Sequence, residues 1–337
     1  MKIEVNNPCF ICKASQSELI FEKEYLKFNY PGKFLMRKCK KCGLLFNSPR
    51  LSAKKFPELY GESYYFFQRD DFDEFHRIAH IYLRTIALVH NKISNKKVIE
   101  IGSGKGYLLA LLKHLGWDVK GIEISSVATQ YALNKFGVLT FEGTVEEFLS
   151  VTHNYGFPIV LAIDVLEHLL DPLKFLRSIN EIIQKGGILI IDTPNSDSYN
   201  IEINGALWSG FNPFHIFIFS KNNLITLLDN IGYKIEKVFS YGNVIEKQTN
   251  GFQKIINDLK EVLKSLLQRF AVLNESKKLY LKLKRLQKHK REDLYYLLRS
   301  AVKIIEKNSS YFEVADSREE LAQNCRGDNI VIIARKI

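Results

Sequence analysis

The stretch V98-I-E-I-G-S-G-K-G-Y107 decides the fold class of this chain. Apolar residues lead into three glycines at alternate positions, and a second apolar run follows from Leu108 to Leu112. A buried strand, a tight turn and a helix give this pattern. The stretch therefore predicts a β–loop–α unit that holds a nucleotide-like ligand.

Strand and helix patterns alternate along the chain after this loop. Strands are expected at 98–101, 117–124, 138–142, 159–163, 188–192, 233–240 and 329–335, and helices at 107–115, 126–136, 145–150, 172–184 and 221–231. Such alternation predicts an α/β fold with a doubly wound, mostly parallel seven-stranded sheet. The last two strands are expected to form an antiparallel edge. Ligands of such sheets bind at the carboxyl ends of the strands.

The composition sets limits on the location of the protein. The chain has 337 residues and a net charge of +11. It contains no uncharged apolar run of about 18 residues, which disfavours a membrane-spanning helix, and its first residues lack a signal-peptide pattern. We therefore expect a cytoplasmic protein, in which paired cysteines indicate a metal before a disulfide.

Four of the five cysteines form two close pairs, Cys9-x-x-Cys12 and Cys39-x-x-Cys42. Each pair supplies two thiolates from one turn, and two such turns suit tetrahedral Zn²⁺. With strands expected at 24–28 and 33–38, the pattern predicts a small N-terminal zinc-ribbon unit whose zinc is structural. Four reduced cysteines without metal are the alternative.

A basic segment interrupts the α/β pattern before the last strand. Residues 252–307 contain 15 Lys or Arg against 6 Asp or Glu, with apolar residues three and four apart. This predicts two or three amphipathic helices inserted before the last strand. They form either a solvated lid or dimer arm, or a cationic surface for peripheral contact with an anionic membrane. Aromatic residues are sparse there, which disfavours nucleic acid, and the oligomeric state stays open.

The glycine loop fits neither of two common phosphate-binding patterns. Tyr107 occupies the position of the third Rossmann glycine, and Lys105 is followed by Gly106 where a P-loop needs Ser or Thr. Glu100 ends the first strand and Glu123 ends the second. A carboxylate such as Glu123 accepts hydrogen bonds from ribose hydroxyls. Together these residues favour a nucleoside that carries an amino acid.

The chain resembles the class I S-adenosylmethionine-dependent methyltransferases. Five segments carry the resemblance in order: 100–106, 121–125, 143–148, 164–172 and 185–195. The resemblance implies S-adenosylmethionine as the methyl donor. It also implies a set of cofactor-binding residues, namely Glu100, Gly102, Ser103, Gly104, Gly106, Glu123, Ile124, Thr144, Val145, Asp164 and Tyr64. The alternative for the Tyr64 region is a hydrophobic latch between the zinc unit and the main domain.

The chain also resembles bacterial methyltransferases with a zinc-binding front domain, which are common in sugar and cell-surface glycan biosynthesis. This resemblance rests on the cysteine pairs, the Tyr-rich segment 59–67 and residues 208–220. The implied acceptor is a small polar molecule, a sugar or glycan precursor methylated at oxygen or nitrogen, with carbon less favoured. The expected divisions are a zinc-binding domain, an aromatic linker and helix, a methyltransferase core, a basic helical insertion and a return segment. Their bounds are 1–58, 59–94, 95–243, 244–310 and 311–337. A binding protein that docks RNA or a membrane through the zinc unit and basic helices is the alternative function.

His168 and His215 are the candidate general bases, and Glu167 is a candidate to orient an imidazole. Backbone hydrogen bonding for His168 and packing for His215 are the structural alternatives. Asp164-x-x-Glu167-His168 also resembles the Glu-x-x-Glu-His set that binds Mg²⁺ in ubiquinone-biosynthesis O-methyltransferases and small-RNA 2′-O-methyltransferases, with Asp for the first Glu. Mg²⁺ at this place is therefore an alternative to a metal-free base.

Overall fold

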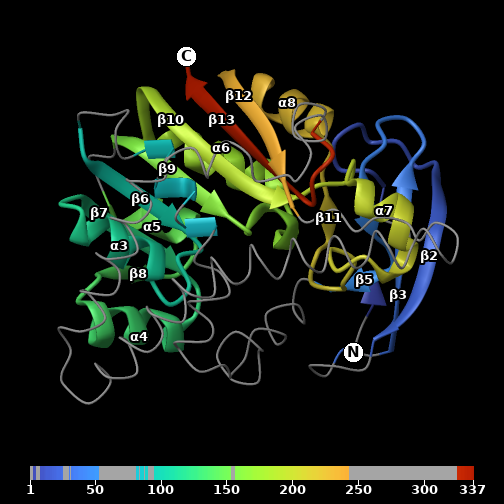
Figure 1. Ribbon diagram of the computed structural model, residues 1–337, viewed down its shortest axis with the longest axis horizontal. Helices are drawn as coiled ribbons and strands as arrows, with labels where there is room; N and C mark the ends of the chain where they lie inside the picture. The colour runs from blue at the N-terminus through green and yellow to red at the C-terminus, as the bar shows by residue number, and fades with distance from the viewer. Residues whose placement is uncertain are drawn as a thin grey trace, which may run out of the picture.

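The structure is a computed structural model, and it describes residues 3–4, 8–25, 30, 32–52, 81–82, 84–86, 88–89, 95–152, 156–242 and 325–337. Figure 1 shows a main sheet with flanking helices and, beside it, an N-terminal unit built of strands. Tyr64 and the basic segment 251–307 lie outside the described residues, so the predictions made for them stay predictions.

Seven strands form the main sheet in the order β12-β13-β10-β9-β6-β7-β8. Their bounds are β6 (Lys97–Ile101), β7 (Asp118–Glu123), β8 (Thr140–Glu142), β9 (Phe157–Ile163), β10 (Ile183–Pro194), β12 (Tyr233–Tyr241) and β13 (Asn329–Lys336). The strands from β8 to β10 run parallel. β13 enters between β10 and β12 and runs antiparallel to both. The predicted fold class and the antiparallel pair at the edge are confirmed.

Most helices of the core begin at a residue whose side chain caps the first turn. Their bounds are α3 (Tyr107–His114), α4 (Ser126–Phe136), α5 (Val145–Val151), α6 (Pro172–Ile182), α7 (Tyr199–Asn204) and α8 (Lys221–Asp229), with the 3-10 turns η2 (Leu166–His168) and η3 (Gly205–Leu207). The Ser125 hydroxyl caps α4, and Gly137 ends it in the left-handed region. Asp171 caps α6 ahead of a proline in its first turn. The helix expected at 172–184 ends at Ile182, because Ile183 instead pairs with Phe157 in the sheet.

Apolar residues on the two faces of the sheet make two large cores. One core joins α3 and α4 to residues of the helical segment at 81–89, such as Ile86 and Val89. The other joins α5, α6 and α8 to buried residues of the N-terminal unit, among them Phe34 and Phe46. The N-terminal unit therefore shares a hydrophobic core with the main sheet.

The N-terminal unit is a four-stranded sheet in the order β11-β4-β3-β2. Its strands are β2 (Ser17–Tyr25), β3 (Gly32–Cys39), β4 (Leu45–Asn47) and β11 (Phe217–Ile218), beside a small pair of β1 (Ile3–Glu4) and β5 (Arg50–Leu51). The strand expected at 24–28 instead begins at Ser17, because Ser17–Tyr25 pairs along the whole of β3. The strand β11 comes from the stretch after α7, so two distant segments close one sheet (Figure 1).

Candidate active site

The glycine loop after β6 is hydrogen-bonded to the carboxyl end of β7. Gly102 and Ser103 both donate their backbone N–H groups to the carbonyl of Ile122. The φ angles of Gly102, Gly104 and Gly106 are 70°, 51° and 75°, a region that favours glycine. A Cβ atom on Gly102 would lie 2.5 Å from Cγ2 of Val165. The loop therefore needs glycine both for its turn and for its close approach to the segment after β9.

Glu123 ends β7 and faces this loop. Its two carboxylate oxygens accept the backbone N–H groups of Gly104, at 2.8 Å, and of Ser125, at 2.9 Å. Burial raises the pKa of the Glu123 carboxyl, and three backbone hydrogen bonds oppose that rise. The side chain is thus held in one orientation by the loop that the sequence singled out.

Glu100 and Ser103 carry buried polar atoms with no hydrogen-bond partner among the described residues. Glu100 is 3% exposed, and its Oε2 is the unpartnered atom. Burial raises the pKa of Glu100 well above its usual range, and the nearby charge of Glu123 raises it further. A buried carboxyl oxygen without a partner costs free energy, and a ligand that donates a hydrogen bond to it removes that cost.

The other predicted cofactor residues have different environments. Ile124 is 58% exposed directly after Glu123, which leaves an apolar surface for a flat ring. The hydroxyl of Thr144 caps α5 in a reciprocal capping box with Glu147, and the side chain of Val145 is buried in the core. Asp164 follows β9 with a φ of 52°, and its carboxylate is 3.4 Å from Nδ2 of Asn329.

His168 and His215 are adjacent although they come from different segments. Their ring centroids are 4.9 Å apart. Nδ1 of His168 is 3.0 Å from the carbonyl of Phe214, and Nδ1 of His215 is 2.8 Å from the carbonyl of Gly210. A carbonyl only accepts, so each Nδ1 carries the proton and each Nε2 keeps its lone pair. Burial lowers the pKa of His168 to about 4, and burial together with the charge of His168 lowers that of His215 to about 3.

Glu167 directly precedes His168 in the chain and is completely buried. Its Oε2 accepts a 2.8 Å hydrogen bond from the Thr193 hydroxyl, and its Oε1 has no hydrogen-bond partner in the described part of the chain. Oε1 lies 3.8 Å from Nε2 of His168. Burial raises the pKa of Glu167 well above its usual range, and the charges of Asp164 and Asp192 raise it further.

The potential ligand atoms of Glu167, His168 and His215 all lie within 4.8 Å of one another. One carboxylate oxygen and two imidazole nitrogens with fixed tautomers form a donor set that suits a divalent cation. Asp164, the first residue of the resembled motif, is not part of this group.

The loop that carries His215 is fixed by two asparagines that the sequence analysis did not single out. Oδ1 of Asn212 accepts the backbone N–H groups of Phe214 and His215. The backbone N–H of Asn47, at the end of β4, donates to the carbonyl of Ile216 at 2.8 Å. The N-terminal unit therefore helps to position the histidine loop.

A second buried network lies at the carboxyl end of β10. The Tyr241 hydroxyl donates to Asp192 at 2.8 Å, and Nδ2 of Asn329 donates to the same carboxylate at 3.1 Å. The guanidinium of Arg84 stacks on the Tyr241 ring, 3.2 Å from its centroid. Arg84 is 5% exposed. No motif in the sequence predicted this network, because its members come from four separate segments.

The four N-terminal cysteines converge as their spacing predicted. Sγ of Cys9 lies 3.4 Å from Sγ of Cys42, and Sγ of Cys12 lies 3.4 Å from Sγ of Cys39. The sulfur atoms of all four lie within 4.8 Å of one another. Tetrahedral zinc with bonds of about 2.3 Å requires sulfur–sulfur separations of about 3.8 Å. The group is compatible with zinc.

The two cysteine turns have the same backbone hydrogen bonds. In the first turn, the N–H of Cys9 donates to the carbonyl of Ala14, and the N–H of Lys13 donates to the carbonyl of Cys9. In the second turn, the N–H of Cys39 donates to the carbonyl of Leu44, and the N–H of Gly43 donates to the carbonyl of Cys39. Lys13 and Gly43, the equivalent residues, have φ angles of 58° and 74°. Glycine takes this conformation readily, whereas Lys13 is an unusual residue to adopt it.

Comparison with known proteins identifies the main domain. The family model described as "Methyltransferase domain" matches residues 68–238, which is more than half of the chain. The chain belongs to this methyltransferase family. The match includes the glycine loop, Glu123 and both histidines of the candidate site.

Two similar curated proteins are methyltransferases too. The chain is 29% identical over 142 residues to a ubiquinone biosynthesis O-methyltransferase of Paraburkholderia phymatum, which covers 40% of this chain and 61% of that protein. It is 32% identical over 146 residues to the protein of the same name from Glaesserella parasuis, which covers 40% of this chain and 62% of that one. The chain thus spans less than two thirds of the length of these relatives.

Among solved structures, a SAM-dependent methyltransferase from Archaeoglobus fulgidus is similar with a TM-score of 0.45 and 16% identity, covering 79% of this chain and all of that one.

None of the helices in the described ranges of this methyltransferase-family chain has the length and apolar character to cross a membrane.

Proposed function

We propose that this protein transfers a methyl group from S-adenosylmethionine to an oxygen atom of a small molecule. The observation that carries the proposal is the cluster of three acceptor atoms on Glu167, His168 and His215. Glu167 of this cluster is two residues after Val165, whose side chain borders Gly102 of the glycine loop. A hydroxyl group must lose its proton as it is methylated, and such a cluster receives a proton or a cation.

The residues around the glycine loop fit the proposed methyl donor. S-adenosylmethionine supplies a methyl group bound to a positively charged sulfur. The unpartnered Oε2 of Glu100 supports a role in accepting a hydrogen bond from the amino group of the donor. Glu123 would accept the ribose hydroxyls, and the exposed Ile124 would pack on the adenine. Gly102, Ser103, Gly104 and Gly106 would line the donor with backbone, and Thr144 and Asp164 would border it.

His168 is the proposed base when no metal is bound. Its Nδ1 proton points to the Phe214 carbonyl, so Nε2 holds the lone pair that accepts the hydroxyl proton of the acceptor. Glu167, whose Oε1 lies 3.8 Å from Nε2 of His168, would help to position the imidazole, and Thr193 orients Glu167. His215 would shape the acceptor side of the same site.

A divalent cation is the second possibility for this cluster, and the mutual distances of its three ligand atoms favour it. Both imidazoles donate Nδ1–H to a backbone carbonyl, which is the usual outer support of a metal-bound histidine. A bound cation would lower the pKa of an acceptor hydroxyl and hold its oxygen. The relatives named as ubiquinone biosynthesis O-methyltransferases support oxygen as the methylated atom.

The four N-terminal cysteines would hold structural zinc, with no position left for a substrate. The boundaries proposed at 58 and 95 would separate this zinc unit from the core. None of the similar proteins above points to a sugar or glycan precursor, so the acceptor is proposed only as a small hydroxylated molecule.

The test is a methylation assay with the full chain, S-adenosylmethionine and three acceptor panels, phenolic, carbohydrate and amine, read by mass spectrometry. Methyl transfer to hydroxyl groups supports the proposal, and transfer to amines alone contradicts it. The cation is tested separately by adding Mg²⁺ to the metal-depleted protein and to its Glu167→Gln variant. A cation-dependent rise in melting temperature in the parent, absent in the variant, supports a metal site. Zinc content is measured in both samples, so that loss from the cysteines is recognised.

A further inference from the structure

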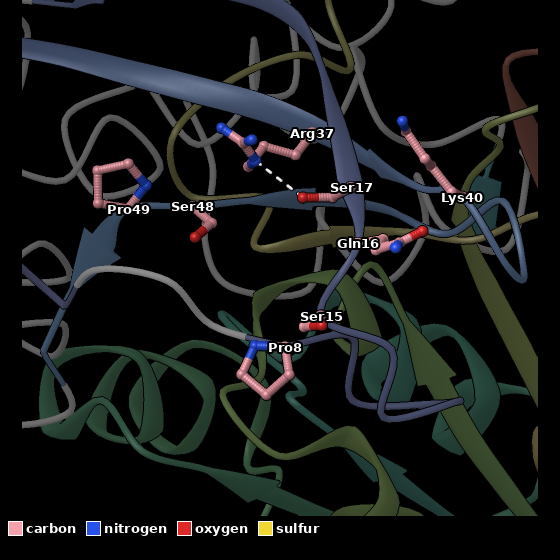
Figure 2. Close-up of a pocket in the computed structure, with 8 residues that line it drawn as sticks. All are labelled: Pro8, Ser15, Gln16, Ser17, Arg37, Lys40, Ser48 and Pro49. Carbon is pink, nitrogen blue, oxygen red and sulfur yellow. Dashed lines mark hydrogen bonds between the residues drawn. The ribbon is translucent and has the colours of Figure 1, made fainter.

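A pocket of 610 Å³ lies on the N-terminal unit, and none of the residues that line it was assigned to the candidate active site. Figure 2 shows its walls: the segment that leads into β2, the end of β3 and its following turn, and the residues after β4. Pockets that bind small molecules in proteins have volumes of about 300–1,000 Å³. The pocket is large enough for a small metabolite.

The charged side chains of this pocket are both cationic. Arg37 and Lys40 line it, and neither has an acidic partner in the described part of the chain. The sequence contains no Asp or Glu between Glu24 and Glu58. Lys33 on the same strand is different, because it pairs with Glu22 at 2.5 Å. Among the described residues, no carboxylate therefore pairs with the positive charge of the pocket.

Hydroxyl and amide groups complete the lining. Nε of Arg37 donates to the Ser17 hydroxyl at 2.9 Å, which orients the guanidinium and leaves its terminal nitrogens for a ligand (Figure 2). The side chains of Ser15, Gln16 and Ser48 also line the pocket. An arginine fork, an ammonium and several hydroxyl donors match the three terminal oxygens of a phosphate group.

We propose that this pocket binds the phosphate group of a small molecule. The inference does not depend on the methyl transfer proposed above. The phosphate belongs either to the methyl acceptor or to a separate metabolite. The first source has a structural basis, because Ser48 follows Asn47, and Asn47 is hydrogen-bonded to the residue after His215.

Lys40 directly follows Cys39, one of the four clustered cysteines, in the chain. Arg37 is oriented by Ser17 rather than by a cysteine. Experiments on the pocket therefore include a measurement of zinc content for each variant.

The test is calorimetric titration of the full chain with inorganic phosphate at fixed ionic strength, with acetate as the control anion. We expect phosphate to bind and acetate not to bind. The Arg37→Ala and Lys40→Ala variants are each expected to bind phosphate about tenfold more weakly, the loss typical of one charge-assisted contact. Lys33→Ala removes the same charge from the same strand outside the pocket and is expected to leave the affinity unchanged.

The proposal is wrong if the parent protein does not bind phosphate, or if Lys33→Ala weakens binding as much as Arg37→Ala does. Weakening in a variant counts only when its zinc content and circular dichroism equal those of the parent. Ser17→Ala, which releases the guanidinium without removing charge, supplies an additional variant and is expected to weaken binding less than Arg37→Ala.

Repeating the titration in the presence of S-adenosylhomocysteine distinguishes the two sources of phosphate. A changed phosphate affinity indicates that the group belongs to the reacting complex, and an unchanged affinity indicates a separate metabolite. Either result supports the pocket. This measurement needs no methyl transfer, so failure of the proposed enzymatic activity leaves the phosphate result interpretable.

Discussion

The ring of His168 contacts the ring of His215 edge to face, at an interplanar angle of 71°. His168 lies in η2, directly after the fourth parallel strand in chain order, whereas His215 lies in the loop that leads to β11. The backbone joins the same two segments, because Ile216 donates its N–H to the carbonyl of Glu167 at 2.7 Å. The main sheet and the N-terminal unit therefore each contribute one wall of the site.

Replacing Glu123 with alanine is expected to weaken the binding of S-adenosylhomocysteine by at least about tenfold, since hydrogen bonds to a charged group contribute about 1.5–3 kcal/mol. The carboxylate also holds the glycine loop through Gly104. Calorimetric titration measures the effect. Glu236→Ala, an exposed acid that pairs with Arg335 at the sheet edge, is the matched control. Equal affinities for the parent and the Glu123 variant would contradict the proposed role.

Replacing Gly102 with alanine is expected to lower the free energy of unfolding. The new Cβ would meet Val165 at 2.5 Å, in addition to the cost of a positive φ. Gly116→Ala is the control, because Gly116 has a φ of 81° and nothing within 4 Å of the added atom. Urea unfolding should show Gly102→Ala to be less stable than Gly116→Ala by about 1–3 kcal/mol. Adding Val165→Ala to the Gly102 variant should recover part of this difference, and equal costs at the two glycines would exclude the contact.

The ionisation of Asp192 should make stability depend on pH. Burial raises its pKa from 3.8 to about 6, so the folded protein retains a proton that the unfolded chain releases between these values. The free energy of unfolding of the parent, relative to an Asp192→Asn variant, is therefore expected to fall as the pH rises from about 4 to about 6. The fall is at most about 3 kcal/mol, since one pKa unit corresponds to about 1.4 kcal/mol. Chemical unfolding at several pH values measures it, and a relative stability that rises over this range would show the opposite sign.

Removing one thiolate of the N-terminal group is expected to remove its zinc. Cys39→Ser should lower the zinc content, measured by atomic absorption, and should lower the melting temperature, because metal binding contributes directly to folding. Cys325→Ser, which also changes a buried cysteine, should retain the zinc of the parent. A parent protein that contains no zinc when purified in zinc-containing buffer would contradict the assignment.

Local patterns predicted the parts of the structure that local interactions determine. The glycine loop, the alternation of strands and helices, and the two cysteine turns were all predicted from neighbouring residues. Glu123 was found because its position at the end of the second strand follows from that alternation. The contact between Glu167 and Thr193 was not predicted, because it depends on the order of β9 and β10 in the sheet.

Two features of the structure have no signal in the sequence. The first is the left-handed conformation of Lys13 in the first cysteine turn, because glycine is the residue that usually takes this conformation. Arg84 stacks on Tyr241 through a packing of segments that are distant in sequence. Such contacts follow from the assembled fold, and no periodicity or motif in the sequence records them.

The pairing of β4 with β11 has a consequence for the evolution of this chain. Because one of these strands lies in the N-terminal unit and the other directly follows the His215 loop, neither segment can be exchanged alone for its counterpart from another protein. A recombination event that replaced only the first 58 residues would leave Phe217 and Ile218 without their strand partners. The unit and the loop are therefore expected to be inherited together.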